Sequence, residues 1–139
     1  MIQTQTIIVY GEPRGKGRPR FAYGGRTYTD AVTTEYEGRV KRIWKSENNF
    51  TFEKSPTTVH IVAYHSVPTS LSKKKRAAMF GQPCLKKPDA DNIAKIILDA
   101  LNGLAYKDDA QIQTLAVEKF YVNEGENPRV EVEITGGIL

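Results

Sequence analysis

Three aspartates carry the most specific chemistry that this sequence could perform. Asp89 and Asp91 lie two residues apart, and Asp109 forms a second acidic pair with Asp108. Because a proline disfavours a helical conformation for the residue before it, a helix should begin directly after Pro88, with Asp89 at its N-cap and Asp91 in its first turn. The positive end of the helix dipole favours ionised carboxylates there, and ionised hard oxygens are the ligands that Mg²⁺ requires. The spacing therefore indicates a candidate Mg²⁺ site.

A simpler interpretation of these residues stays open. Aspartate is common at helix N-caps and in turns, and capping alone explains Asp89. Convergence of Asp89, Asp91 and Asp109 would favour a metal site instead. Two carboxylates about 5 Å apart repel by about 3 kcal/mol at an effective dielectric constant of about 20, and a divalent cation between them relieves that repulsion. Spacing along the chain does not decide between the two interpretations.

Lys95 lies four residues after Asp91 and therefore one turn along the same helix face. It is either half of an i, i+4 surface pair or a cation that stands beside the metal site and faces a phosphate. Asp99 continues this face by a further turn. We interpret Asp99 as a helix-surface or pairing residue rather than a ligand.

Other catalytic and metal-binding patterns fit the sequence worse. An EF-hand loop counted from Asp89 would need glycine at its sixth position, where the chain has Ala94. His60 and His65 lie in or near a predicted strand, and each is expected to be a satisfied strand or surface histidine. The single cysteine, Cys84, excludes an intrachain disulfide and is expected to be an inert thiol. The sequence contains neither a P-loop nor a dinucleotide-binding fingerprint.

Positive charge is concentrated upstream of the aspartates. Residues 1–88 contain 16 lysines and arginines against 6 acidic residues, a balance of +10, whereas residues 89–139 contain 4 against 10, a balance of −6. The upstream cations form three clusters that we predict to bind DNA phosphates: Arg14, Lys16, Arg18 and Arg20; Lys73, Lys74, Lys75 and Arg76; Lys86 and Lys87. Glycines in the first cluster would let the backbone approach a phosphate, and Phe21 and Tyr23 could stack on exposed bases. Each cluster taken alone could also be a solvated loop or helix face.

Hydrophobic periodicity predicts the elements that must position these residues. We expect strands at residues 6–10, 57–64, 111–122 and 129–134, helices at 30–45, 69–80 and 89–101, a loop at 11–25 and a hairpin loop at 123–127. The first helix should bury Val32, Tyr36, Val40, Ile43 and Trp44, and the last should bury Ile93, Ile96, Ile97, Ala100 and Leu101. This order predicts an α+β fold, with a mixed β-sheet of about four strands packed with about three helices.

Length and composition limit the class of protein. With 139 residues, of which 40% are hydrophobic and 26% charged, the chain is expected to form a single globular domain over residues 1–139. It has no run of 18 apolar residues that could span a membrane, and its first residues do not form a secretory signal. We therefore expect a cytoplasmic protein.

Several stretches form an ordered pattern across most of the chain. They are Lys16-Gly17-Arg18-Pro19-Arg20, the helical region 28–44, Lys87-Pro88-Asp89-Ala90-Asp91-Asn92, Lys95, Asp99-Ala100-Leu101-Asn102-Gly103 and Asp108-Asp109-Ala110-Gln111-Ile112. Together they resemble the RusA-type Holliday junction resolvases of bacteria and their prophages. The resemblance implies a homodimer that uses Mg²⁺ to resolve four-way DNA junctions by paired nicks during recombination and repair.

The resemblance also implies roles for individual residues. Asp89, Asp91 and Asp109 would be catalytic residues and metal ligands, with Asp108 as the alternative to Asp109, and Lys95 would be a catalytic lysine. Independently of the resemblance, apolar faces left over by so small a core, including Trp44 or the final Ile138 and Leu139, are candidates for the homodimer interface. Two other functions stay open: a non-catalytic basic DNA-binding module, and a Mg²⁺-dependent nuclease acting on other branched DNA or on RNA.

Overall fold

The computed structural model describes residues 1–17, 20–25, 27–48 and 50–137. The elements are β1 (Ile2–Tyr10), β2 (Arg20–Phe21), β3 (Thr27–Tyr28), α1 (Ala31–Glu47), β4 (Thr57–His65), α2 (Lys73–Met79), α3 (Ala90–Leu101), the 3₁₀ turn η1 (Asp109–Gln111), β5 (Ile112–Tyr121) and β6 (Arg129–Gly137). The predicted α+β class is confirmed, with a four-stranded mixed sheet and three helices. None of the helices in the described ranges has the length and apolar character needed to cross a membrane.

The main sheet has the strand order β1-β6-β4-β5. Strand β6 runs antiparallel to both of its neighbours, whereas β4 and β5 are parallel. The predicted hairpin at residues 123–127 is therefore wrong, because β4 lies between β5 and β6. The chain between β4 and β5 makes a crossover that carries α2, α3 and η1, which is the connection that adjacent parallel strands require. Both acidic pairs lie within this crossover. Asp89 and Asp91 are at the start of α3, and Asp108 and Asp109 are at the start of η1.

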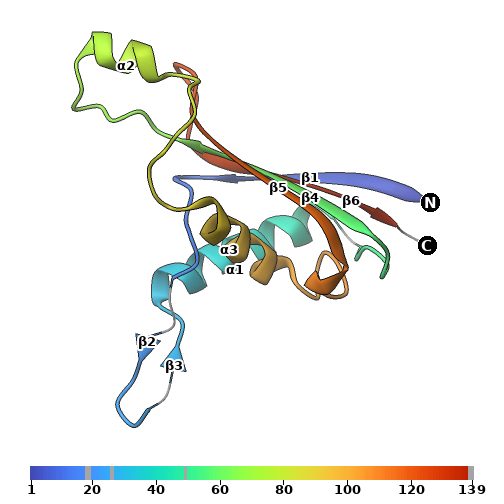
Figure 1. The fold of residues 1–139 in the computed structure, drawn as a ribbon. Coiled ribbons are helices and arrows are strands. Elements are labelled where there is room, and N and C mark those ends of the chain that lie inside the picture. The colour runs from blue at the N-terminus through green and yellow to red at the C-terminus, as the bar shows by residue number, and fades with distance from the viewer. Residues whose placement is uncertain (18–19, 26, 49, 138–139) are drawn as a thin grey trace.

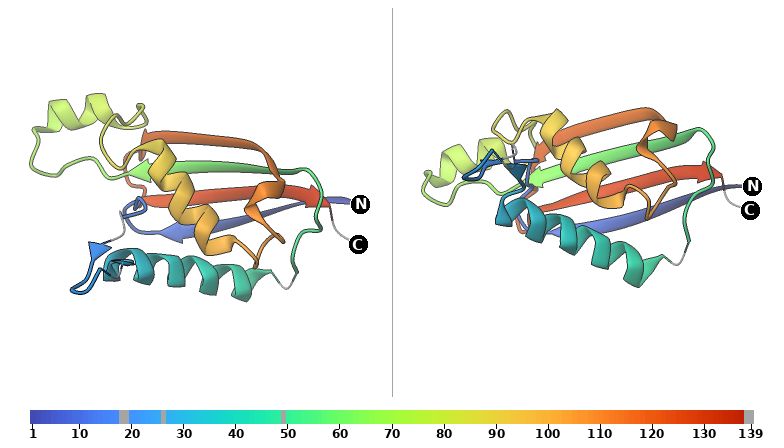
Figure 2. Two further views of the ribbon diagram at one scale, coloured as in Figure 1. Left: turned by 60° about the horizontal axis from the view of Figure 1, so that its bottom comes forward. Right: turned by 90° about the horizontal axis from the view of Figure 1, so that it is seen from below.

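Helices α1 and α3 lie side by side on one face of the sheet and enclose the core (Figures 1 and 2). The apolar face predicted for α3 is confirmed, since each of its five residues is at least 95% buried in the core. In α1, Tyr36, Val40 and Trp44 are buried as expected, but Val32 is 55% exposed and Thr33 takes the buried position in the first turn. Trp44 is only 1% exposed, so the suggestion that it forms a homodimer interface is wrong. Ile138 and Leu139 lie outside the described residues.

The two sides of the sheet differ in character. Along β6, Val130, Val132 and Ile134 are completely buried beneath the helices, as the alternating pattern predicted. Glu131 and Glu133 point to the opposite side, where Figure 2 shows no helix over the sheet. The protein therefore packs its core on one side of the sheet and exposes a polar surface on the other.

Two structures project from the same end of the domain, close to the start of α3 (Figures 1 and 2). One is the small β2–β3 hairpin, which occupies part of the predicted loop at 11–25. The other is the α2 arm, residues 66–84, whose helix is shorter than the predicted 69–80 because Ser72 caps it by accepting a bond from the Lys75 N–H. The α2 arm is joined to the sheet by a small apolar cluster of Val67, Cys84 and Tyr121. The two basic projections thus flank the helix end that carries Asp89 and Asp91.

Candidate active site

The carboxylate of Asp89 is not used to cap α3. Asp89 has the backbone conformation of an N-cap residue, but its side chain makes no capping hydrogen bond. In contrast, the carboxylate of Asp30 accepts a hydrogen bond from the Thr33 N–H at 2.8 Å at the start of α1. The side chain of Asp89 is 54% exposed, and its Oδ1 lies 3.9 Å from the Lys87 Nζ. Capping therefore does not explain Asp89, and its oxygens face solvent beside the exposed Asp91.

In the second acidic pair, Asp108 and Asp109 have different environments. Asp108 caps η1, where its carboxylate accepts a hydrogen bond from the Ala110 N–H. In return, the Asp108 N–H donates to the Gln111 Oε1 at 3.2 Å. Gln111 also donates to the Thr57 Oγ1 at 2.9 Å, which ties this turn to the start of β4. The backbone N–H of Asp109 donates to the Asn102 Oδ1 at 3.0 Å, at the end of α3. Asp108 thus has a structural role in the turn, and the Asp109 side chain does not cap it.

Asp109 lies in an acidic environment that Lys95 partly balances. A hydrogen bond shared with the Asp108 carboxyl, together with burial and the negative charges of Asp108 and Asp99, raises the pKa of Asp109 above its ordinary value. The ammonium of Lys95 acts in the opposite direction and lowers the pKa. Lys95 is therefore within electrostatic reach of Asp109 while lying one helical turn from Asp91.

The structure brings together only part of the predicted metal site. Asp109, Asp99 and Lys95 are close enough to influence one another, whereas Asp89 and Asp91 lie at the first turn of α3. Within the described ranges, no group of three or more His, Cys, Asp or Glu side chains is placed to hold a metal ion. The assignment of Asp89, Asp91 and Asp109 as shared ligands therefore stays a prediction.

The first basic cluster begins with a segment that is packed against the protein rather than free. An added Cβ on Gly15 would lie 2.8 Å from the Pro88 Cβ, and one on Gly17 would clash with the Asp30 carboxylate. Between them, the Lys16 N–H donates to the Asn92 carbonyl at 2.9 Å. The two glycines thus allow the chain to pass close to the first turns of both α1 and α3. Close packing therefore explains these glycines without the approach to a phosphate that the sequence also suggests.

The side chain of Lys16 joins the two helices. Its Nζ lies 2.8 Å from the Glu37 Oε2 on α1 and 3.2 Å from the Asp99 Oδ2 on α3. Burial would lower the pKa of Lys16, but the hydrogen bonds to both carboxylates outweigh it and raise the pKa above its ordinary value. Lys16 is therefore a cation held between two acids, and Asp99 is a pairing residue as predicted.

Replacing Lys16 by methionine should lower the free energy of unfolding by roughly 1–3 kcal/mol, because Glu37 and Asp99 would then face each other without their cation. The measurement is chemical denaturation at neutral pH. Lys75→Met on the exposed face of α2 is the matched control and should change stability by less than about 0.5 kcal/mol. Equal unfolding midpoints for the two variants would mean that the Lys16 ion pairs add nothing to stability.

The other predicted DNA-binding residues are mostly at the surface. Arg14, Lys86 and Lys87 are exposed, as are Lys73, Lys74 and Lys75 on α2. The Arg76 guanidinium lies over the Phe80 ring, 5.6 Å from its centroid. Arg20 belongs to β2, and Arg18 lies outside the described residues. Exposure alone does not show that these residues bind DNA, so DNA binding by these residues stays a prediction.

The two histidines differ from each other. The Nε2 of His60 lies 2.6 Å from the Glu118 Oε1 on the exposed side of the sheet, as expected for a surface residue. His65 is only 6% exposed, and its Nε2 has no hydrogen-bond partner among the described residues. Burial and the positive charge of Lys119 lower the pKa of His65. The expectation of a satisfied histidine is thus wrong for this nitrogen.

Sequence reasoning missed three residues that support the site. Asn102, which directly follows the helix predicted at residues 89–101, accepts a hydrogen bond from the Asp109 N–H and so positions the backbone of Asp109. Gln111 lies three residues after Asp108, which is the spacing of a capping box and could have been recognised. Glu37 is 21 residues from Lys16 along the chain, and nothing local in the sequence indicates that pair.

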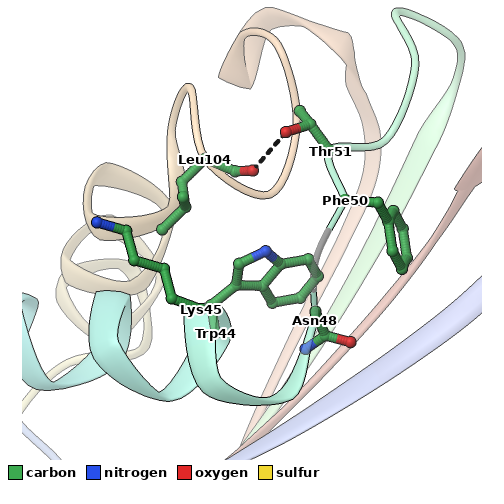
Figure 3. Close-up of a pocket in the computed structure, with 6 residues that line it drawn as sticks. All are labelled: Trp44, Lys45, Asn48, Phe50, Thr51 and Leu104. Atoms are coloured by element: carbon green, nitrogen blue, oxygen red, sulfur yellow. Dashed lines mark hydrogen bonds between the residues drawn. The ribbon is translucent and has the colours of Figure 1, made fainter.

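A hollow of about 260 Å³ lies elsewhere, at the C-terminal end of α1 (Figure 3). It is lined by Trp44, Lys45, Asn48, Phe50, Thr51 and Leu104, and the Thr51 hydroxyl donates to the Leu104 carbonyl at 2.8 Å across it. Lys45 is the one charged residue among these six. The hollow offers no carboxylate and is not part of the acidic site.

Comparisons with known proteins match most of the chain to one protein family. Residues 10–135 match a family model described as endodeoxyribonuclease RusA. The chain is also similar to a protein of Bacillus subtilis (strain 168) described as "Uncharacterized protein YqaN", with 40% identity over 136 residues that cover 92% of this chain and 93% of that protein. The family match includes all of the residues predicted to form the site, from Arg14 to Asp109.

Proposed function

Since the chain belongs to the RusA endodeoxyribonuclease family, we propose that it is a Mg²⁺-dependent, structure-selective endodeoxyribonuclease that resolves four-way DNA junctions in the cytoplasm. The observation that carries the proposal is the Asp89 carboxylate at the start of α3, which makes no capping hydrogen bond and lies beside Asp91 between two basic projections. A helix cap would have used that carboxylate, whereas a metal ligand must keep it available.

The donor set fits Mg²⁺. Asp89, Asp91 and Asp109 supply hard carboxylate oxygens, and we propose that these three residues hold the ion. Bound there, Mg²⁺ would lower the pKa of an attacking water and neutralise charge on the scissile phosphate. Lys95, between Asp91 and Asp109, would place its ammonium against the negative charge that develops on the phosphate in the transition state. The exposed lysines of α2 and Lys86 and Lys87 would hold DNA arms through their phosphates.

We further propose that the active particle is a homodimer. Resolution of a four-way junction requires two cuts in strands of like polarity, and one chain contains one set of Asp89, Asp91, Asp109 and Lys95. A two-fold dimer presents a second set in the matching orientation, because such an interface repeats each contact. Paired nicks within one binding event then follow from the symmetry of the particle.

A labelled four-way junction incubated with the protein, with Mg²⁺ or with EDTA, tests this function. We expect paired cuts with Mg²⁺ and none with EDTA, and little cutting of a flap or of an RNA hairpin. On a supercoiled plasmid that extrudes a cruciform, a dimer should give linear product directly. Relaxed circles as the main early product would contradict paired nicking, preferential cutting of flaps or RNA would indicate a different nuclease, and binding without cutting would indicate a DNA-binding module.

A further inference from the structure

The tip of the β2–β3 hairpin exposes two aromatic rings with no protein surface to cover them. Phe21 is 81% exposed and Tyr23 is fully exposed. Strands β2 and β3 pair only with each other among the described strands, and the turn is made by Gly24 and Gly25, both at positive φ. A Cβ added to either glycine would meet nothing within 4 Å. Large apolar side chains on a projection of this kind indicate an interaction site.

The root of this hairpin is fixed close to the candidate active site. The Lys16 N–H donates to the Asn92 carbonyl at 2.9 Å in the first turns of α3, and the Gly17 N–H donates to the Thr33 Oγ1 at 3.2 Å in the first turn of α1. At Gly15 the chain passes so close to Pro88 and Asn92 that it leaves no room for a Cβ. Residues 18–19, which separate this root from β2, lie outside the described ranges. The contacts at the root mean that the aromatic tip and the helix end with Asp89 and Asp91 belong to one side of the molecule (Figure 1).

The charge of the segment indicates which kind of surface the rings contact. Besides Lys16, whose charge is paired with Glu37 and Asp99, residues 13–29 contain Arg14, Arg18, Arg20 and Arg26 and no acidic residue. A cationic segment is attracted to a polyanion, and aromatic rings next to cations stack well on the faces of nucleic-acid bases. In continuous duplex DNA the base faces are covered by their neighbours. They become available where the stack is interrupted, as at a branch point.

We propose that Phe21 and Tyr23 stack on bases at the branch point of the DNA, and that this contact selects a junction over a linear duplex. The proposal rests on the DNA-processing function proposed above and adds the element that recognises the substrate. Phosphate contacts from the lysines attract any DNA, because every duplex carries the same backbone charge. The two rings provide the contact that depends on DNA structure.

The test compares a variant with both Phe21→Ala and Tyr23→Ala against the natural protein in EDTA, so that binding is measured without cutting. We expect the ratio of junction affinity to duplex affinity to fall by about ten-fold or more for the pair of rings, since one stacked base is worth roughly a factor of ten. A 2-aminopurine base at the branch point should change its fluorescence on binding the natural protein and not on binding the variant. Tyr10→Ala, which removes a 58% exposed ring at the end of β1, is the matched control and should leave both readouts unchanged.

Three outcomes would overturn the proposal. The first is an unchanged affinity ratio and 2-aminopurine signal in the double variant. The second is an equal loss of affinity for junction and duplex, which would make the rings a general DNA contact. The third is a loss of self-association, which would make a second copy of the chain the occupant of the tip. The stacking proposal is tested by binding in EDTA, whereas the nuclease function is tested by cutting in Mg²⁺. Failure of cutting would therefore refute the nuclease function without deciding whether the rings stack on bases.

Discussion

Replacing Asp89 or Asp91 by asparagine should lower the rate of junction cleavage by about 10³-fold or more, with junction affinity changed by only a few-fold. Each variant loses a hard anionic oxygen from the proposed metal site, and metal stabilisation of the transition state is worth several kcal/mol. The basic projections that we propose to contact phosphates are left intact. The measurement pairs single-turnover cleavage in Mg²⁺ with binding of the same labelled junction in EDTA.

Two controls make this experiment specific. Asp109→Asn should also lose cleavage, whereas Asp108→Asn should keep both cleavage and stability, because asparagine can cap η1 about as well as aspartate. Glu133→Gln changes the charge equally on the opposite side of the sheet and should cleave normally. If the Asp89 or Asp91 variant cuts at a rate close to that of the natural protein, the assignment of these aspartates as metal ligands is wrong.

Replacing Lys73, Lys74 and Lys75 by alanine should weaken junction binding by about 10²–10³-fold at 0.1 M salt and flatten its salt dependence. Six to eight phosphate contacts would give the natural protein a log–log salt slope of about −5 to −7, and each lost contact removes nearly one unit of slope. The three lysines are exposed on the projecting α2 helix. The measurement is junction affinity as a function of salt concentration.

The matched control removes three exposed cations from α1: Lys41, Arg42 and Lys45. They lie toward the end of α1 that is remote from the α2 arm, so this variant should keep the natural slope. An unchanged slope in the α2 variant would mean that α2 faces away from DNA. An equal change in both variants would mean that net charge rather than the α2 arm governs binding.

Local sequence patterns were sufficient for α3 and for the fold class. The apolar repeat of α3 begins directly after Pro88 and ends at Asn102-Gly103, and the observed helix differs from the predicted bounds by one residue at its start. The repeat is strong because one whole face of α3 packs on the sheet. The order of strands and helices then determined the α+β class, since a helical crossover implies a parallel strand pair.

Contacts between distant parts of the chain were not predictable in the same way. Strand β4 pairs with β5 on one edge and with β6 on the other, and no local pattern in the sequence indicates this arrangement. The short loop at 123–127 predicted instead that the two strands on either side of it pair with each other as a hairpin. The ion pairs of Lys16 with Glu37 and Asp99 were not predictable, because both partners are far away in sequence. The roles of Asp108 and Asp109 differ through the Gln111 capping box, for which the sequence did contain the signal.

The position of β6 has a consequence for when the protein becomes active during its synthesis. Strand β6 is the last strand of the described chain, yet it lies in the interior of the sheet, between β1 and β4. A chain still on the ribosome has released β1, β4 and the whole crossover with its aspartates before residues 129–137 emerge, so its sheet lacks an interior strand. We expect such nascent chains to leave DNA uncut, so that the proposed nuclease activity would begin only after β6 has emerged and completed the sheet.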